Sequence, residues 1–95
     1  MSANKKYQQA IQSIFNEQEK ILGQAISAQL ADQIDAITIS SKHSILVKDD
    51  SDPKLVLENL VNQYSKLFGR ASVEVAKDAI KEIAFTPQEL PSNLK

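Results

Sequence analysis

The sequence predicts an α+β fold in the order α-β-β-α, with a long helix on each side of a β-hairpin. Two apolar stripes with a period near 3.6 residues predict the helices, and a short alternating segment between them predicts the hairpin. The only two glycines, Gly23 and Gly69, lie at matching places within the stripes. We expect each helix to be kinked or broken at its glycine. Splitting both helices fully gives the alternative order α-α-β-β-α-α.

A weak internal repeat indicates that the two helical units are related. Residues 16–34 and 62–80 align at an offset of 46, and six of nineteen positions are identical where chance gives about one. The identical pairs are Asn16/Asn62, Lys20/Lys66, Gly23/Gly69, Ala25/Ala71, Asp32/Asp78 and Ile34/Ile80. We therefore expect pseudo-repeats at about 7–34 and 53–80.

The first apolar stripe indicates one amphipathic helix that continues through Gly23. Its members are Tyr7, Ala10, Ile11, Ile14, Phe15, Ile21, Leu22, Ala25, Ile26, Leu30 and Ile34. A straight helix of this length would measure about 43 Å, whereas a compact domain of this size is about 32 Å across. The helix must therefore bend at Gly23 or project towards a second copy. Gly23, Ser27 and Ala31 form a strip of small residues, so we expect close helix packing at Gly23 and at its counterpart Gly69.

Residues 36–48 alternate β-branched and polar side chains around a short polar interruption, which predicts the β-hairpin. A two-residue turn at residues 41–42 would pair Ile39 with Ser44 and Ile37 with Leu46. A three-residue loop at residues 41–43 instead puts four β-branched residues on one face, and we expect this register because burial fixes it. Its pairs are Ile39 with Ile45 and Ile37 with Val47. The outer edges of the hairpin should remain open to another strand.

The second helix has a strong start signal, with Asp52 as N-cap and Pro53 at the first helical position. Its stripe also continues through a glycine and consists of Leu57, Leu60, Val61, Tyr64, Leu67, Phe68, Ala71, Val75, Ala79 and Ile83. The helix should end near Ile83 to Phe85, and we expect a single small domain over residues 1–85. Residues 86–95 contain two prolines and are interpreted as a tail draped over the surface.

Composition excludes several classes of site. The chain has 95 residues, a net charge of −1 and no cysteine, which rules out disulfides, thiolate metal sites and a cysteine nucleophile. Eleven basic against twelve acidic residues give no field that would attract nucleic acid or an anionic membrane, and we expect neither partner. No apolar run is long enough to span a bilayer. We expect a cytoplasmic protein without a cofactor.

Candidate catalytic and metal-binding residues are few. His43 is the only histidine and lies in the predicted hairpin loop, with no acid or nucleophile beside it in sequence. Asp49, Asp50 and Asp52 are closely spaced, but the EF-hand pattern fails because Lys54 stands where glycine is required. Helix capping accounts for these acids, so we expect no metal site and no catalytic residue.

The best candidates for contact with a ligand or partner are Arg70 and Lys66. Arg70 is the one arginine of the chain and follows Gly69, where the other copy of the repeat has Gln24. A guanidinium group binds carboxylates and phosphates through a planar fork, so this pair would face an anionic group. The alternative interpretation is an ordinary surface arginine and lysine.

The segment Leu-Phe-Gly-Arg-Ala-Ser-Val-Glu-Val-Ala at residues 67–76 resembles the short helical modules appended to some bacterial signalling proteins, including serine/threonine kinases. A looser version occurs at residues 21–26. Those modules typically carry Gly-Pro-x-Ala, whereas Gln24 and Arg70 occupy the proline position here. The resemblance implies a regulatory or interaction role and provides no catalytic residue.

The sequence therefore favours a small non-catalytic regulatory or protein-interaction module, which we expect to form a homodimer or to bind another protein. The alternative is a small-ligand sensor that holds an anionic metabolite between the helices and the hairpin, with Arg70 or Lys66 facing the anion. A small enzyme whose reactive groups meet only in the fold is a third class, and no motif favours it.

Overall fold

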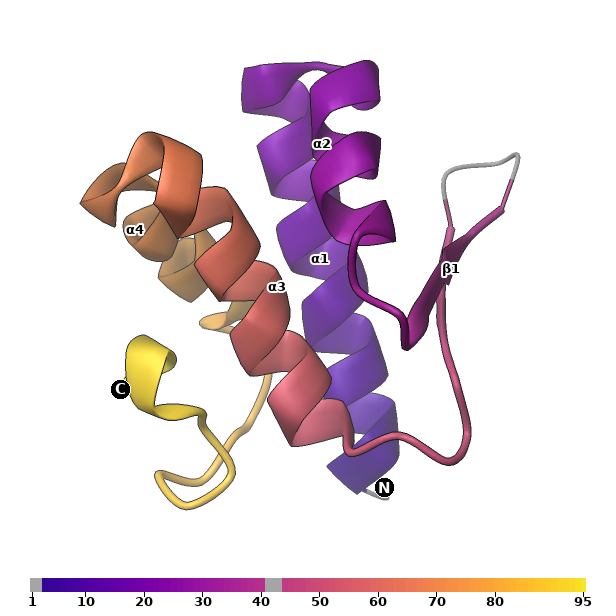
Figure 1. Ribbon diagram of the computed structural model, residues 1–95. Coiled ribbons are helices and arrows are strands. Elements are labelled where there is room, and N and C mark those ends of the chain that lie inside the picture. The colour runs from indigo at the N-terminus through magenta and orange to yellow at the C-terminus, as the bar shows by residue number, and fades with distance from the viewer. Residues whose placement is uncertain (1–2, 41–43) are drawn as a thin grey trace.

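Helices and a two-stranded antiparallel sheet make up the fold of the computed structural model (Figure 1). The structure describes residues 3–40 and 44–95. Within them the elements are α1 (Ala3–Leu22), α2 (Gln24–Asp32), β1 (Ile37–Ile39), β2 (Ile45–Val47), α3 (Pro53–Phe68), α4 (Arg70–Ile80) and a final 3-10 turn, η1 (Ser92–Leu94). The predicted mixture of helix and sheet is confirmed. The order of elements is that of the fully split alternative.

Each glycine joins two helices that fold back on one another, as α1 and α2 show most clearly (Figure 1). The φ angles of Gly23 and Gly69 are 87° and 63°, and their ψ angles of 162° and −147° place them where essentially only glycine is unstrained. The Gly23 N–H donates to the Glu19 carbonyl at 2.9 Å, and the Gly23 carbonyl accepts from the Ser27 N–H at 3.2 Å. One residue thus ends α1 and begins α2.

The expectation of close helix packing at Gly23 and Gly69 is wrong. Both residues are exposed, and a Cβ atom added to either would meet nothing beyond its chain neighbours within 4 Å. Ser27 and Ala31, the other members of the small-residue strip, are fully buried. Glycine is needed for its backbone angles, and the reversal also removes the length conflict because the folded molecule measures 31 × 28 × 19 Å.

The chain reversal changes which face of each shorter helix is buried. The buried residues are Ser27 and Ala31 in α2 and Ser72, Ala76 and Ile80 in α4. The continued stripes had instead selected Ala25, Ile26 and Leu30 in the first unit and Ala71, Val75 and Ala79 in the second. Ile21, Leu67 and Phe68, also expected in the core, are exposed. Of the stripe residues in α2 and α4, Leu30 and Ala79 are half-buried and pack against the core, whereas Ala25, Ile26 and Ala71 are exposed. The predictions fail at the exposed positions because the turn at glycine sets a new helical phase, so the period of the preceding helix no longer applies.

The hairpin adopts the register that burial favours, and this prediction is confirmed. Ile39 pairs with Ile45 and Ile37 with Val47, as a three-residue loop requires. The side chains of Ile37 in β1 and Ile45 in β2 are buried in the core. The loop itself, with His43, lies outside the described residues.

One edge of the hairpin is covered by side chains of α1. The Gln8 amide donates to the Ile45 carbonyl at 2.7 Å, and the Ile45 N–H donates to Gln12 Oε1 at 2.8 Å. Two glutamine side chains therefore satisfy the outward-facing backbone groups of Ile45 in β2, as a neighbouring strand would.

The start of α3 follows the sequence prediction. The Asp52 carboxylate accepts from the backbone N–H groups of Lys54 at 3.0 Å and Leu55 at 3.5 Å, with Pro53 at the first helical position. The apolar core lies mainly between α1 and α3 and consists of Tyr7, Ala10, Ile11, Ile14, Phe15, Ala31, Ile34, Ile37, Ile45, Val56, Leu57, Leu60, Val61, Tyr64, Ala76, Ile80 and Leu94.

A buried polar network takes one side chain from each of the four helices. The Tyr64 hydroxyl donates to the Ser27 carbonyl at 3.1 Å and lies 3.1 Å from Ser27 Oγ. The Ser72 hydroxyl donates to the Tyr64 carbonyl at 3.3 Å, and the Gln18 amide donates to the Ser72 carbonyl at 3.2 Å. Burial raises the pKa of the Tyr64 phenol to about 12. These bonds join the α1–α2 helical hairpin to the α3–α4 helical hairpin.

The segment at residues 86–95 is docked onto the helices. The Tyr7 hydroxyl donates to the Glu89 carbonyl at 2.6 Å, and Lys6 Nζ lies 3.0 Å from a Glu89 carboxylate oxygen. Leu94 is buried in the core beside α3 and α4. The hydrogen bonds of Glu89 with Thr86 and Lys6 lower the pKa of its carboxyl group.

Candidate functional site

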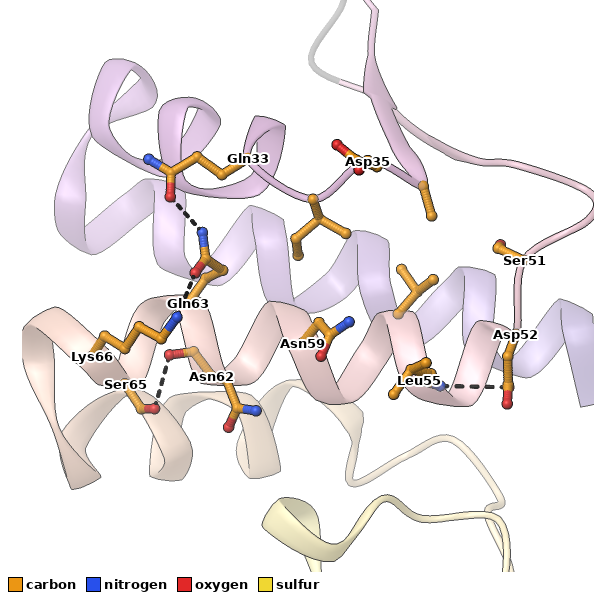
Figure 2. Close-up of a pocket in the computed structure, with 13 residues that line it drawn as sticks. Gln33, Asp35, Ser51, Asp52, Leu55, Asn59, Asn62, Gln63, Ser65 and Lys66 are labelled. Carbon is orange, nitrogen blue, oxygen red and sulfur yellow. Dashed lines mark hydrogen bonds between the residues drawn. The ribbon is translucent and has the colours of Figure 1, made fainter.

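A hollow of about 730 Å³ lies along the exposed side of α3, beside the end of α2 and the connection to β1 (Figure 2). Leu55 and Val56 contribute apolar surface from α3, and Ile34 does so from the α2–β1 connection. Asp52 lies at one end of the hollow and Lys66 at the other (Figure 2). The hollow is therefore acidic at the start of α3 and basic near its end.

A second hollow, of about 510 Å³, continues this surface towards the glycine turns. It is lined by Ile26, Gln29, Leu30, Gln33, Gln63, Lys66, Leu67 and Phe68. Gln33, Gln63 and Lys66 line both hollows, so the two form one continuous surface, which we call the α2–α3 face. Its apolar hollow is defined by Ile26, Leu30, Leu67 and Phe68.

Large apolar side chains are exposed on the α2–α3 face. Leu67 is 60% exposed, Leu55 51%, Ile26 46% and Phe68 41%. Exposed apolar residues scattered singly are normal on protein surfaces, but three of these four line the same hollow. A cluster of this kind indicates a surface that binding would cover.

Amide side chains form the middle of the face. Gln63 Nε2 donates to Gln33 Oε1 at 2.7 Å (Figure 2). It also donates to the Leu30 carbonyl at 3.0 Å. Lys66 Nζ donates in turn to Gln63 Oε1 at 3.3 Å. These bonds join α2 to α3 at the surface, above the buried contact between Tyr64 and Ser27. The apolar hollow is therefore held on two linked helices and has a defined shape.

The structure separates the two cations predicted from the sequence. Lys66 is exposed in the last turn of α3 and lines both hollows. Arg70 is exposed at the first position of α4 and is absent from the lining of either hollow. Asp52 caps α3, and Asp49 and Asp50 are exposed. Across residues 3–40 and 44–95 no three His, Cys, Asp or Glu side chains are grouped to hold a metal ion.

Sequence reasoning missed the residues that define the α2–α3 face. The continued stripes predict Ile26, Leu30, Leu67 and Phe68 in the core, but only Leu30 packs against it, and the other three are exposed. Leu55 gave a usable signal, since it is a large apolar residue in the first turn of α3 that does not belong to the stripe. The same signal fails at Val56, which also lies outside the predicted stripe but is buried in the core.

Comparison of the chain with protein-family models, characterised proteins and solved structures found no match. In the described part of the chain, no helix is both long enough and apolar enough to cross a membrane. The site is therefore interpreted from its own residues.

Proposed function

We propose that this protein is a non-catalytic interaction module whose α2–α3 face binds another protein chain. The apolar hollow formed by Ile26, Leu30, Leu67 and Phe68 carries the proposal, because three of its residues are more than two-fifths exposed. Covering apolar surface is favourable by about 25 cal/mol per Å². The amides and the lysine that surround the hollow match the polar rim of a protein interface.

An anionic small-molecule ligand is supported less well by the same surface. Lys66 would attract an anion at one end of the larger hollow, but Asp35 and Asp52 also line it. Two carboxylates would repel an anion that filled the hollow. Arg70, the better anion-binding side chain, lines neither hollow.

Site-specific photocrosslinking in the cells that make the protein tests the proposal. A benzophenone amino acid replaces Gln29, which is exposed and lines the apolar hollow, and in a control it replaces Ile21. Ile21 is 62% exposed but lies elsewhere, beside Glu17 and Asp78. We expect irradiation to give a covalent protein adduct from position 29 and little from position 21. No adduct from position 29, or equal adducts from both, would contradict the proposal. Mass spectrometry of the adduct identifies the partner.

A further inference from the structure

We infer that the α2–α3 face binds a second copy of the same chain, with Leu55 of each copy inserted into the apolar hollow of the other. The inference rests on the proposed function and names its partner. Leu55 lies near one end of the face, and the apolar hollow lies at the other. In a two-fold contact, residue i of one copy meets residue j of the partner and j meets i. The Leu55 side chain of each copy can therefore enter the apolar hollow of the other, which gives two equivalent contacts.

The spacing along α3 sets the register of this contact. Leu55 and Leu67 are twelve positions apart, which is about 18 Å along a helix. A two-fold axis that lies in the interface, perpendicular to α3 at the level of Val61, relates the two helices in opposite directions. Leu55, Asn59, Gln63 and Leu67 form one i±4 row that is inclined to the helix axis, so the two α3 helices cross at about 50° when these rows interdigitate and each Leu55 comes opposite the partner's Leu67. The same axis places Asn59 opposite the partner's Gln63. Both amides lie on the face, where the Asn59 amide can donate to the partner's Gln63 Oε1, since the Gln63 donors are already bonded to Leu30 and Gln33.

The charges on the face agree with an antiparallel arrangement. Asp35 and Asp52 line the Leu55 end of the face, and Lys66 lies towards the other end (Figure 2). The two-fold contact brings the acidic end of each copy towards the Lys66 end of the partner. A parallel arrangement would instead place carboxylates against carboxylates, which costs free energy. Antiparallel α3 helices also oppose their dipoles favourably.

The β-hairpin offers a poorer surface for a second copy. The outward backbone groups of Ile45 in β2 already bond to Gln8 and Gln12. The other edge, β1, spans only Ile37–Ile39, and the Ile37 N–H donates to the Ile34 carbonyl at 3.0 Å. A strand this short, with one outward donor already used, leaves little backbone for pairing.

The small size of the face predicts a weak dimer. α3 is about 24 Å long, and two packed helices present a width of about 20 Å. The footprint is then roughly 500 Å² on each copy, below the roughly 800 Å² per partner that stable complexes bury. We expect a weak dimer that forms and dissociates as the protein concentration changes.

Disulfide trapping tests the register directly, because the chain has no cysteine of its own. Leu55→Cys and Leu67→Cys are prepared separately, mixed and oxidised mildly. We expect a disulfide between the two variants, whereas Leu55→Cys alone should give little product. Two copies of position 55 would lie about 18 Å apart, and a disulfide requires Cα atoms within about 7 Å. The inference is overturned if Leu55→Cys links to itself as readily, or if the mixed product does not exceed that of an Ile21→Cys control.

Sedimentation equilibrium of the unmodified chain tests whether the contact forms in solution. The apparent mass should rise from 10.5 kDa towards about 21 kDa as the concentration rises to ~1 mM. Leu55→Asp should weaken association at least about tenfold, whereas Ile21→Asp, at a comparably exposed position, should leave it unchanged. Lys66→Glu should weaken it as well, and adding Asp35→Lys should restore it.

A mass of one chain at every concentration would overturn the inference without removing the proposed function. Crosslinks from position 29 to a different protein would then identify a heterologous partner for the same face. A single-chain mass together with no crosslink from position 29 would contradict both.

Discussion

The two seams between the helical hairpins are closed to different extents. Between α1 and α4, the Gln18 amide is buried and donates to the Ser72 carbonyl. Between α2 and α3 (Figure 1), Tyr64 is fully buried, but Leu67 and Phe68 are exposed. Both seams bury hydrogen-bonded polar groups. The α1–α4 seam leaves Ile21 as an isolated exposed apolar side chain, whereas the α2–α3 seam gathers Ile26, Leu67 and Phe68 in one hollow, where they gain by being covered. The difference separates a contact that maintains the fold from a surface available to a partner.

The largest expected effect on stability comes from the buried contact between Tyr64 of α3 and Ser27 of α2. Tyr64→Ala removes a fully buried aromatic side chain and should lower the free energy of unfolding by about 3–5 kcal/mol. Tyr64→Phe keeps the ring and should cost only about 1–2 kcal/mol, because Ser27 loses its hydroxyl partner. Urea unfolding measures both. If Tyr64→Ala unfolds at the urea concentration of the parent, the contact does not hold the hairpins together.

The pH dependence of stability provides a second test of the burial of Tyr64. The Tyr64 phenol has a pKa of about 12 in the folded chain against its ordinary 10, so the folded state keeps a proton that the unfolded state releases. The resulting stabilisation is fully present below pH 10 and is lost as the pH rises to about 12, by on the order of 2 kcal/mol. Burial and the nearby Glu89 also raise the pKa of Tyr7, which adds to the loss.

Urea unfolding at a series of pH values checks this prediction, with Tyr64→Phe as the comparison. The variant should lose less stability over the alkaline range than the parent does, and Tyr7 should account for the remainder. Equal losses in the two proteins would show that Tyr64 titrates normally.

Substitutions at Gly23 and Gly69 should change the free energy of unfolding only through the backbone angles at these turns. Gly23→Ala and Gly69→Ala should each cost about 1–3 kcal/mol, because an L-residue is strained at these angles. Leucine should cost about as much as alanine, since nothing lies within 4 Å of the added Cβ. D-alanine, introduced by chemical synthesis, should be neutral or stabilising. A much larger cost for leucine than for alanine would point to a close contact at the turn.

The smallest expected effect on stability is at the exposed apolar residues between α2 and α3, which we call the open seam. Leu67→Ser should change the free energy of unfolding by less than about 0.5 kcal/mol in dilute solution, because the side chain is mostly in water. The same variant should weaken association. A loss of stability as large as that of Tyr64→Phe would mean that Leu67 belongs to the core.

Local rules predicted the features that depend on neighbouring residues. Asp52 and Pro53 specify the start of α3 because a cap needs only a side chain and the next helical turn. The hairpin register followed from placing Ile37 and Ile45 on one buried face. Neither prediction required knowledge of the rest of the chain.

The sequence contains conflicting indications of which residues of α2 face the core, because the small-residue strip contained Ser27 and Ala31, which are buried, and the apolar stripe contained Ile26, which is exposed. Continuing the first stripe placed Ile26 inside and passed over Ser27, whereas the structure buries Ser27 and exposes Ile26. The backbone angles of Gly23 decide this exchange, and a periodic pattern carries no information about them. The candidate site was hidden for the same reason, since the exposed residues resembled core residues. Of the two predicted cations, only Lys66 lies on the face.

Hydrogen exchange at two protein concentrations about a hundredfold apart tests the central claim most directly, namely that the open seam is where another copy binds. Raising the concentration should slow exchange of backbone amides in α2 and in the last turn of α3. Exchange around Ile21 and Val75, which lie together on another surface, should stay the same. Added protection that appeared around Ile21 or along β1, with none in α2, would contradict the account.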